Sequence, residues 1–136
     1  MITRRHLLSG LAGVSILGLM AGPSLALMII PYTGSELDAL AASGEPYVIN
    51  FHATWCPTCA AQQRVLDALQ GESAAYAAIP ILRVDWDSYG NSELARNLAI
   101  PRRSTLVLMR GSAELGRLVA ETRKEQIAAL LDLAGS

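Results

Sequence analysis

Hydrophobic positions along the chain fall into two patterns, one typical of strands and one typical of helices. Nearly continuous apolar runs bounded by turn residues predict buried strands, because a strand covered on both faces shows little polar alternation. Apolar residues repeated three and four positions apart predict helices that bury one side. The first pattern predicts strands at 27–30, 47–53, 79–85, 105–109 and 115–120.

The second pattern predicts helices between and after these strands. One helix is expected to begin at a capping box, Thr33 with Glu36, and to end at Gly44. Another capping box, Thr122 with Glu125, predicts the start of the last helix. The expected core-facing residues are Val65, Leu66 and Leu69 in the helix at 60–70, Leu94 and Leu98 in the helix at 93–98, and Ile127, Leu130, Leu131 and Ala134 in the last helix.

The order of these elements predicts the class of fold. Gly111 separates the last two strands and predicts an antiparallel hairpin, whereas residues 87–91 are expected to form a loop. The resulting order is β-α-β-α-β-α-β-β-α. Strands that alternate with helices in this way describe an α/β domain whose central mixed sheet has helices on both faces.

Cys56 and Cys59 are the only two cysteines of the 136-residue chain, and they separate a predicted strand from a predicted helix. A Cys-x-x-Cys in this position is typical of a redox-active dithiol. The unpaired N–H groups and the positive dipole at a helix start favour the thiolate of Cys56. Pro57 suits the first helical turn, which needs no N–H donor. We therefore expect Cys56 to attack a disulfide and Cys59 to resolve the mixed disulfide, without an organic cofactor.

Two other interpretations of the cysteine pair remain open. A structural disulfide across so short a loop would constrain the unfolded chain little. A zinc site would need about two more ligands, and the only histidines are His6 and His52. We expect a redox site and no metal.

Residues 1–26 have the features of a secretory signal peptide. Arg4 and Arg5 precede an uncharged apolar stretch, and the segment Ser24-Leu25-Ala26 supplies small residues for a signal peptidase. The paired arginines are also similar to a twin-arginine signal. The alternative is an uncleaved anchor in the inner membrane, since 7–30 is long enough to span a bilayer; membrane contact is expected only in that case. Either way, residues 27–136 are expected in the periplasm, where disulfides persist.

Charge and length limit the kinds of partner expected for residues 27–136. Without residues 1–26, nine basic residues stand against twelve acidic ones, which gives a net charge of −3. This acidic balance argues against a nucleic-acid partner. The remaining 110 residues bury one modest core, so we expect a single domain, and we expect it to be a monomer.

Residues 27–136 resemble the thioredoxin family. The resemblance rests on Phe51, the segment Ala-Thr-Trp-Cys-Pro-Thr-Cys at 53–59, Val84-Asp85, and the strand that follows Ile100 and opens at Thr105. It implies a thioredoxin fold and a thiol–disulfide oxidoreductase that acts on protein disulfides or thiols. Another redox protein would then supply or accept the electrons. The residues assigned a supporting role around the dithiol are Trp55, Pro57, Thr58 and Asn50.

Two residues expected near the dithiol, Asn50 and Ile81, depart from the family pattern. The family usually has a buried aspartate six residues before the first active-site cysteine, where this chain has Asn50. An amide cannot accept a proton, so Asn50 cannot serve Cys59 as a base. The lysine usually paired with that aspartate corresponds to Ile81. We expect Asn50 to be a hydrogen-bonded core amide, and the functional consequence would be slower deprotonation of Cys59.

The third departure concerns the loop that binds substrate in the family. A cis-proline normally stands directly before the threonine of the late strand, and here Ser104 precedes Thr105. A cis bond before a non-proline residue costs about 2.5–4 kcal/mol, so we expect a trans bond. The backbone of Arg103, Ser104 and Thr105 is expected to face Cys56 and to bind a substrate peptide. The alternative is a local shift that gives Pro101 this role.

Three other side chains have two possible roles each. Arg102 and Arg103 would favour the Cys56 thiolate and attract acidic partners if their loop adjoins the dithiol, and otherwise they face solvent. His52 is expected to be packed and neutral rather than to tune the thiol. Trp55 is expected to combine packing with contact to a partner.

The direction of electron flow is predicted from length. We expect a reductant, because the segment between Cys59 and Ile79 leaves no room for the large helical insertion of Dsb-type oxidases. The Pro-Thr dipeptide also resembles that of some cytochrome-maturation thioredoxins. The alternatives are a disulfide-forming oxidant and a module that holds extended peptides at 103–104 by strand addition.

Overall fold

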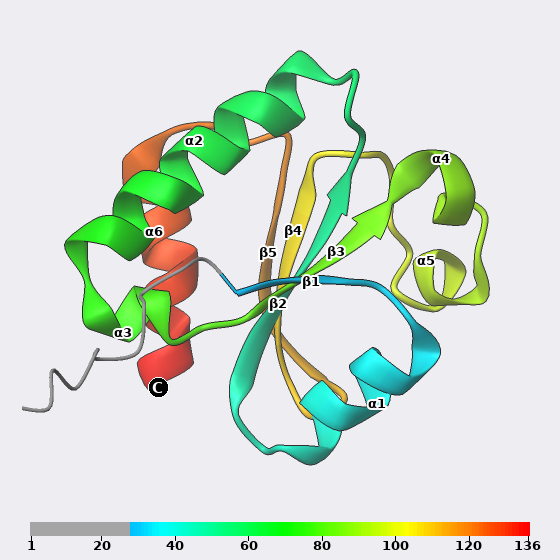
Figure 1. Cartoon of the computed structure of the whole chain (residues 1–136), viewed down its shortest axis with the longest axis horizontal. Coiled ribbons are helices and arrows are strands. Elements are labelled where there is room, and N and C mark those ends of the chain that lie inside the picture. Colours follow the sequence, from blue (N-terminus) through cyan, green and yellow to red (C-terminus); the bar gives the residue numbers. More distant parts are fainter. Residues whose placement is uncertain (1–27) are drawn as a thin grey trace, which may run out of the picture.

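The computed structural model describes residues 28–136, and the structural statements below concern that part of the chain. Five strands form one sheet in the order β1-β3-β2-β4-β5 (Figure 1). The strands are β1 (Ile29–Pro31), β2 (Pro46–His52), β3 (Ile81–Asp85), β4 (Thr105–Arg110) and β5 (Ala113–Val119). β3 is parallel to β1 and β2, whereas β4 is antiparallel to β2 and β5. The predicted mixed sheet is confirmed, and the signal segment predicted at 1–26 lies outside the described residues.

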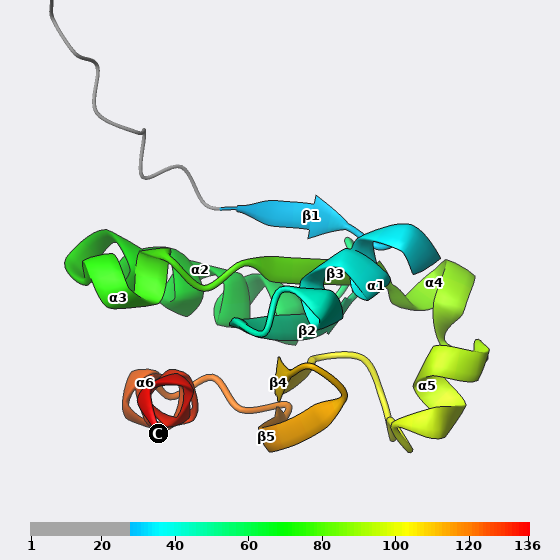
Figure 2. The same cartoon turned by 90° about the horizontal axis from the view of Figure 1, so that it is seen from below.

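Helices cover both faces of this sheet, as predicted. Figures 1 and 2 show α2, α3 and α6 on one side and α1, α4 and α5 on the other. The helices are α1 (Gly34–Ala42), α2 (Pro57–Glu72), α3 (Ala74–Ala77), α4 (Trp86–Tyr89), α5 (Glu93–Asn97) and α6 (Lys124–Asp132), followed by a 3-10 turn at Leu133–Gly135. Within residues 28–136, none of the helices has the length and apolar character needed to cross a membrane.

Each face of the sheet has its own apolar core. Val48, Leu66 and Ile127 belong to the cluster under α2 and α6, while Ile49 and Leu82 belong to the cluster under α1 and α5. Val48 and Ile49 are neighbours on β2, so the period-two alternation of a strand sends them to opposite faces. Each such buried side chain contributes about 1.5–3 kcal/mol of hydrophobic stabilisation. Together the two clusters hold β2 rigidly, and β2 leads directly into the cysteine segment.

Local signals at helix ends were predicted with mixed success. The Thr33 cap is confirmed, because its Oγ1 accepts the Glu36 N–H at 3.0 Å. The Thr122 cap was wrong: Arg123 is the N-cap residue, and its side chain makes no capping bond. Instead a carboxylate oxygen of Glu121 accepts the N–H groups of both Thr122 and Arg123. A charged carboxylate is a stronger acceptor than a hydroxyl and takes over the capping role.

Two short helices were absent from the prediction. The expected loop at 87–91 is partly helical, because α4 covers Trp86–Tyr89. The Asp85 carboxylate caps this turn by accepting the Ser88 N–H at 3.2 Å. α3 was not predicted at all, and Ser73 caps it by accepting the Tyr76 N–H at 3.3 Å. Helices of four residues are too short to show a hydrophobic period, so these capping side chains were the available signal.

Candidate active site

Cys56 and Cys59 lie at the junction between β2 and α2. Cys56 is the N-cap residue of α2, and its Sγ accepts the Cys59 N–H at 3.2 Å. Pro57 occupies the start of the helix, as expected. Both cysteines are free thiols, and they are 2% and 1% exposed. The strand–Cys-x-x-Cys–helix arrangement predicted from the sequence is therefore confirmed.

The Ser104 hydroxyl lies between the two sulfurs. Its Oγ is 3.2 Å from the Cys56 Sγ and 3.0 Å from the Cys59 Sγ. Ser104 is completely buried and has a φ of 63°, a left-handed conformation that is uncommon outside glycine. The prediction that the 103–104 segment faces Cys56 is confirmed.

The backbone of Ser104 is held in this conformation by three hydrogen bonds. Its N–H donates to the Phe51 carbonyl at 2.8 Å, and its carbonyl accepts from the Ala120 N–H at 2.9 Å. The Gln62 Nε2 donates to the same Ser104 carbonyl at 2.9 Å and to the Glu121 carbonyl at 3.0 Å. Strained backbone persists only where the surroundings fix it, and here β2, α2 and the chain after β5 do so.

The residues expected to bind substrate differ in which of their backbone groups remain available for a peptide. They are Arg103, Ser104 and Thr105. Ser104 uses both backbone groups internally, and Thr105 pairs with β2 and β5 inside the sheet. Among the described residues, no hydrogen bond from the Arg103 N–H is found. No peptide bond is cis within residues 28–136, as expected at Ser104, and Pro101 is exposed. Ser104, rather than Pro101, lies against the sulfurs.

Hydrogen bonding separates the acidities of the two thiols. Burial of Cys56 opposes its ionisation, but hydrogen bonds from Cys59, Ser104 and Arg103 outweigh burial and lower the pKa of the Cys56 thiol to about 6. Burial and the hydrogen bond to Cys56 raise the pKa of Cys59. Near neutral pH, Cys56 is therefore the thiolate and Cys59 the thiol, which is the assignment a nucleophile and a resolving cysteine require.

Half-buried Arg103 and exposed Trp55 form the rim of the site. The Arg103 guanidinium carbon lies 4.4 Å from the centre of the Trp55 ring, within reach of a cation–π interaction. Trp55 is 56% exposed, and its indole N–H donates to the Asp87 carboxylate at 2.9 Å. Arg102 donates through Nε to the Arg103 carbonyl at 3.2 Å. Of the two cations predicted near the dithiol, Arg103 is the one that acts on Cys56.

Behind the dithiol, the structure corrects the prediction for Asn50. This residue is 1% exposed, and neither atom of its amide has a hydrogen-bond partner among the described residues. The expected hydrogen-bonded core amide is therefore wrong. Apolar side chains such as Val48 occupy the same face of β2, and they offer the amide no donor or acceptor.

Arg83 is a site residue that the sequence analysis missed. It is the register partner of Asn50 on β3, so the two side chains lie on the same face of the sheet. Burial lowers the pKa of Arg83, and attraction to Asp67 and Cys59 opposes that shift, so its positive charge acts on the resolving thiol. Ile81 does stand at the lysine position, but Arg83 comes two residues later on the same face. The alternation of a strand was the signal that could have identified it.

Two remaining side chains of the predicted site, His52 and Thr58, are half-buried. His52 is half-buried, and burial followed by the Arg83 charge lowers its pKa despite attraction to Asp85, which agrees with a packed, neutral imidazole. Thr58 is half-buried in the first turn of α2. Within residues 28–136, no three histidine, cysteine, aspartate or glutamate side chains gather as metal ligands would.

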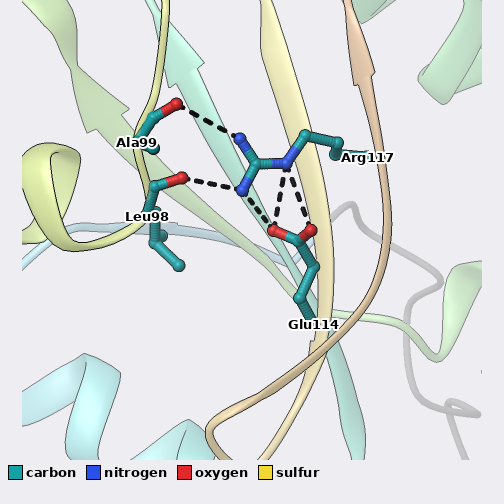
Figure 3. Close-up of polar contacts among 4 residues, drawn as sticks. All are labelled: Leu98, Ala99, Glu114 and Arg117. Carbon is teal, nitrogen blue, oxygen red and sulfur yellow. Dashed lines mark hydrogen bonds and ion pairs between the residues drawn. The ribbon is translucent and has the colours of Figure 1, made fainter.

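A second anchor fixes the segment that leads into Ser104. Figure 3 shows Arg117 of β5 reaching the carbonyl groups at the end of α5. Its Nη2 donates to Leu98 at 2.7 Å and its Nη1 to Ala99 at 3.4 Å, while Glu114 pairs with the same guanidinium. The loop from Ala99 to Ser104 is thus tied to the sheet at both ends, by Arg117 at the start and by the Ser104 backbone at the finish.

Comparisons with known proteins agree with this geometry. The family model described as Thioredoxin matches residues 29–133. A thioredoxin of Oryza sativa is 33% identical over 78 residues, which cover 57% of this chain and 53% of the relative. A bifunctional thioredoxin reductase/thioredoxin of Mycobacterium leprae is 30% identical over 93 residues, 68% of this chain and 19% of that protein. The chain thus spans about half and about a fifth of these two relatives. A thioredoxin of Staphylococcus epidermidis is 29% identical over 106 residues, 78% of this chain and 97% of the relative.

Solved structures show the same fold. The crystal structure of Trxlp from Edwardsiella tarda superposes with a TM-score of 0.68 at 27% identity, covering 76% of this chain and 97% of that one. A thioredoxin structure from Malassezia sympodialis gives a TM-score of 0.66 at 17% identity, covering 81% of this chain and 96% of that one, a similarity of fold alone. The family match, the fold and the paired thiols at the start of α2 lead to one conclusion: this chain belongs to the thioredoxin family.

Proposed function

We propose that this protein reduces disulfide bonds of other proteins in the bacterial periplasm. The observation that carries the proposal is the division of labour between the two thiols, with the pKa of Cys56 lowered to about 6 and that of Cys59 raised. The value for Cys56 is closer to the roughly 7 of thioredoxin than to the roughly 3.5 of the strong periplasmic oxidant. A less stabilised thiolate makes the reduced form a better electron donor.

The proposed reaction follows from the different pKa values of the two thiols. The Cys56 thiolate attacks one sulfur of a substrate disulfide, forms a mixed disulfide and releases the other substrate sulfur, which takes a proton from water. Cys59 then loses its proton to water and attacks the Cys56 sulfur. The substrate departs as a second thiol, and the protein retains a Cys56–Cys59 disulfide. Two electrons pass from protein to substrate, and a separate redox protein must return them.

The rim of the site fits an extended peptide of the substrate. The Arg102 and Arg103 N–H groups of the loop make no hydrogen bond among the described residues, and the exposed Trp55 ring offers an apolar surface beside Arg103. A peptide strand that pairs with Arg103 would bring its own disulfide next to Cys56. Trp55, Pro57 and Thr58 shape the entry to the thiols in this proposal, and Arg103 binds the peptide.

The connection between α2 and β3 also favours a reductant. The four residues of α3 are the one helix between these elements, so residues 73–80 hold no helical insertion of the kind found in Dsb-type oxidases. Export is supported by the signal-like pattern of residues 1–26, and mass spectrometry of the protein recovered from a periplasmic fraction tests it. A chain beginning near Leu27 is the expected result, whereas an intact N-terminus would indicate the membrane-anchored alternative.

The direction of electron flow is tested by the reduction potential of the Cys56–Cys59 pair in glutathione buffers, together with an insulin-reduction assay. A potential near roughly −270 mV with turnover of insulin supports a reductant. A potential near roughly −120 mV would indicate a disulfide-forming oxidant instead. The Cys59→Ser variant is the control, because it should accumulate the mixed disulfide without completing turnover.

A further inference from the structure

The Ser104 side chain touches both reacting atoms of the site. Its hydroxyl is 3.2 Å from the Cys56 Sγ and 3.0 Å from the Cys59 Sγ, and within the described chain these two sulfurs are its only hydrogen-bond partners. The residue is completely buried, so solvent does not compete for the hydroxyl. The three backbone bonds to Phe51, Ala120 and Gln62 fix where the oxygen can be.

A hydroxyl has one proton to donate, so at any moment the Ser104 O–H donates to one of the two sulfurs. In the reduced protein, Cys56 is the thiolate and can only accept, so the Ser104 O–H donates to it. Cys59 carries the S–H and donates that proton to the Cys56 thiolate as well. When Cys56 enters a mixed disulfide, its sulfur loses the negative charge and becomes a weak acceptor. The Ser104 proton is then free to serve the other sulfur.

We propose that the Ser104 hydroxyl stabilises the two thiolates in turn, first that of Cys56 before attack and then that of Cys59 before resolution of the mixed disulfide. The change requires only rotation about the Cβ–Oγ bond, because the oxygen already lies within hydrogen-bond distance of both sulfurs. Ser104 does not take up the Cys59 proton, which goes to water; the hydroxyl stabilises the charge left behind. This inference rests on the proposed roles of Cys56 and Cys59.

Two further observations support this role. The hydrogen bond from Ser104 lowers the pKa of Cys56 and that of Cys59, although burial and Cys56 raise the latter overall. In addition, Asn50 cannot assist the deprotonation of Cys59 as a base. Ser104 therefore supplies part of what a buried carboxylate would contribute.

The charged neighbours of the pair act on one sulfur each. Arg103, from the same loop, stabilises the Cys56 thiolate, whereas Arg83 of β3 acts on Cys59. The other titratable groups on the elements packed against the site are His52 of β2, Asp85 of β3, Asp87 of α4, Arg64 and Asp67 of α2, Arg102 of the loop, and Glu121 after β5. Ser104 is thus distinguished from Arg103 by acting on both sulfurs, and Arg103→Ala is a matched control.

The two steps are separated by reacting the reduced protein with dithiobis(nitrobenzoate) in a stopped-flow spectrophotometer. Attack by Cys56 releases one thionitrobenzoate, and resolution by Cys59 releases a second. Each rate is measured from pH 4 to pH 10 for wild type, Ser104→Ala, Ser104→Gly and Arg103→Ala. Glycine accepts a φ of 63° without strain, so it keeps the test open if the alanine variant folds poorly.

The expected result is that Ser104→Ala and Ser104→Gly each move the pH midpoints of both releases upward by about one unit, because a hydrogen bond to a charged group is lost. At pH 7 the second release becomes about tenfold slower, and at high pH both rates return to wild-type values. Arg103→Ala moves only the first midpoint. An unchanged second midpoint in both serine variants would overturn the inference, as would rates lowered equally at every pH, since that indicates a structural role. If wild type itself releases no second thionitrobenzoate, the proposed function fails as well.

Discussion

The two faces of the sheet share the same strands but bury different kinds of side chain near the carboxyl end of β2. On the face under α1 and α5, Ile49 and Phe51 continue an apolar cluster to the end of the strand. On the face under α2 and α6, apolar Val48 is followed by buried Asn50. A step of two residues toward the thiols thus changes that face from apolar to polar.

In the described part of the chain, the face that carries the thiols is also the one that buries polar side chains without partners. Asn50, Gln62 and Arg83 all carry buried polar atoms without a hydrogen-bond partner among the described residues. Each such group costs about 1–3 kcal/mol relative to a satisfied one. Within residues 28–136, the face under α1 and α5 carries no such group, whereas the face under α2 and α6 combines an apolar core of its own with the polar groups near the thiols.

The largest expected effect is a loss of activity, caused by a substitution on the face of the sheet that carries the thiols. Cys56→Ser removes the nucleophile, and insulin reduction should be lost completely, because a serine hydroxyl is not ionised near neutral pH. The substitution exchanges sulfur for oxygen at a site that is already hydrogen-bonded, so the melting temperature of the reduced protein should stay close to that of wild type. Residual turnover in a Cys56→Ser preparation free of wild-type protein would refute the assignment of the nucleophile.

The next largest effect is a loss of stability, caused by a substitution on the face under α1 and α5. Leu82 is completely buried in the cluster under α1 and α5. Leu82→Ala should lower the free energy of unfolding by about 2–5 kcal/mol, because it removes a buried side chain and leaves a cavity. The pH midpoint for alkylation of Cys56 by iodoacetamide should remain near 6, since Leu82 points away from the thiols. Urea denaturation and alkylation rates measure the two quantities, and a midpoint that shifts with Leu82 would show that the faces are coupled.

Features that depend on local sequence signals could be predicted, whereas contacts between distant residues could not. The apolar strands and the Cys-x-x-Cys were predicted because both signals are local: a hydrophobic run in one case and a spacing in the other. Ser104 was located by counting back from Thr105, yet the contacts of its hydroxyl depend on a left-handed φ fixed by Phe51, Gln62 and Ala120. Those residues are far apart in the chain, and no periodic pattern links them. Arg83 was missed for a different reason: the family resemblance points to position 81, whereas Arg83 lies two residues later on the same face of the strand.

Substitutions of Asn50 are expected to change stability by an intermediate amount. Asn50→Leu makes the polar face resemble the apolar one and should raise the free energy of unfolding by about 1–3 kcal/mol, since two unpaired amide atoms leave the core. Equilibrium urea denaturation measures the gain. A loss of stability would mean that the amide is satisfied in solution.

Asn50→Asp at the same position has the opposite sign and depends on pH. Burial should raise the pKa of the introduced carboxyl above the roughly 3.9 of the unfolded chain. Below about pH 4 the group is protonated in both states and causes no loss through ionisation. As pH rises from about 4 toward the folded-state pKa, only the unfolded state ionises freely, so the variant should become progressively less stable than wild type, and the loss should level off above the folded-state pKa. Denaturation at pH 4 and pH 8 tests this, and equal losses at the two pH values would contradict it.

The smallest effect compares two arginines that make the same kind of contact in different places. Arg117 donates to the carbonyl groups of Leu98 and Ala99 beside the loop to Ser104, and Arg110 donates to those of Ala134 and Ser136 at the other end of the hairpin. Each alanine substitution should lower the free energy of unfolding by about 1–2 kcal/mol, because charge-assisted hydrogen bonds to backbone are lost.

Only one of the two substitutions should reach the thiols. Arg117→Ala frees the start of the Ala99–Ser104 loop, so the Ser104 hydroxyl is held less closely to the sulfurs and the pH midpoint of Cys56 alkylation should rise by a fraction of a unit. Arg110→Ala leaves that loop anchored and should leave the midpoint unchanged. Because the two variants lose similar stability, a difference between their midpoints reports position rather than general loosening. Equal midpoints would show that the three backbone bonds of Ser104 hold the loop without help from Arg117.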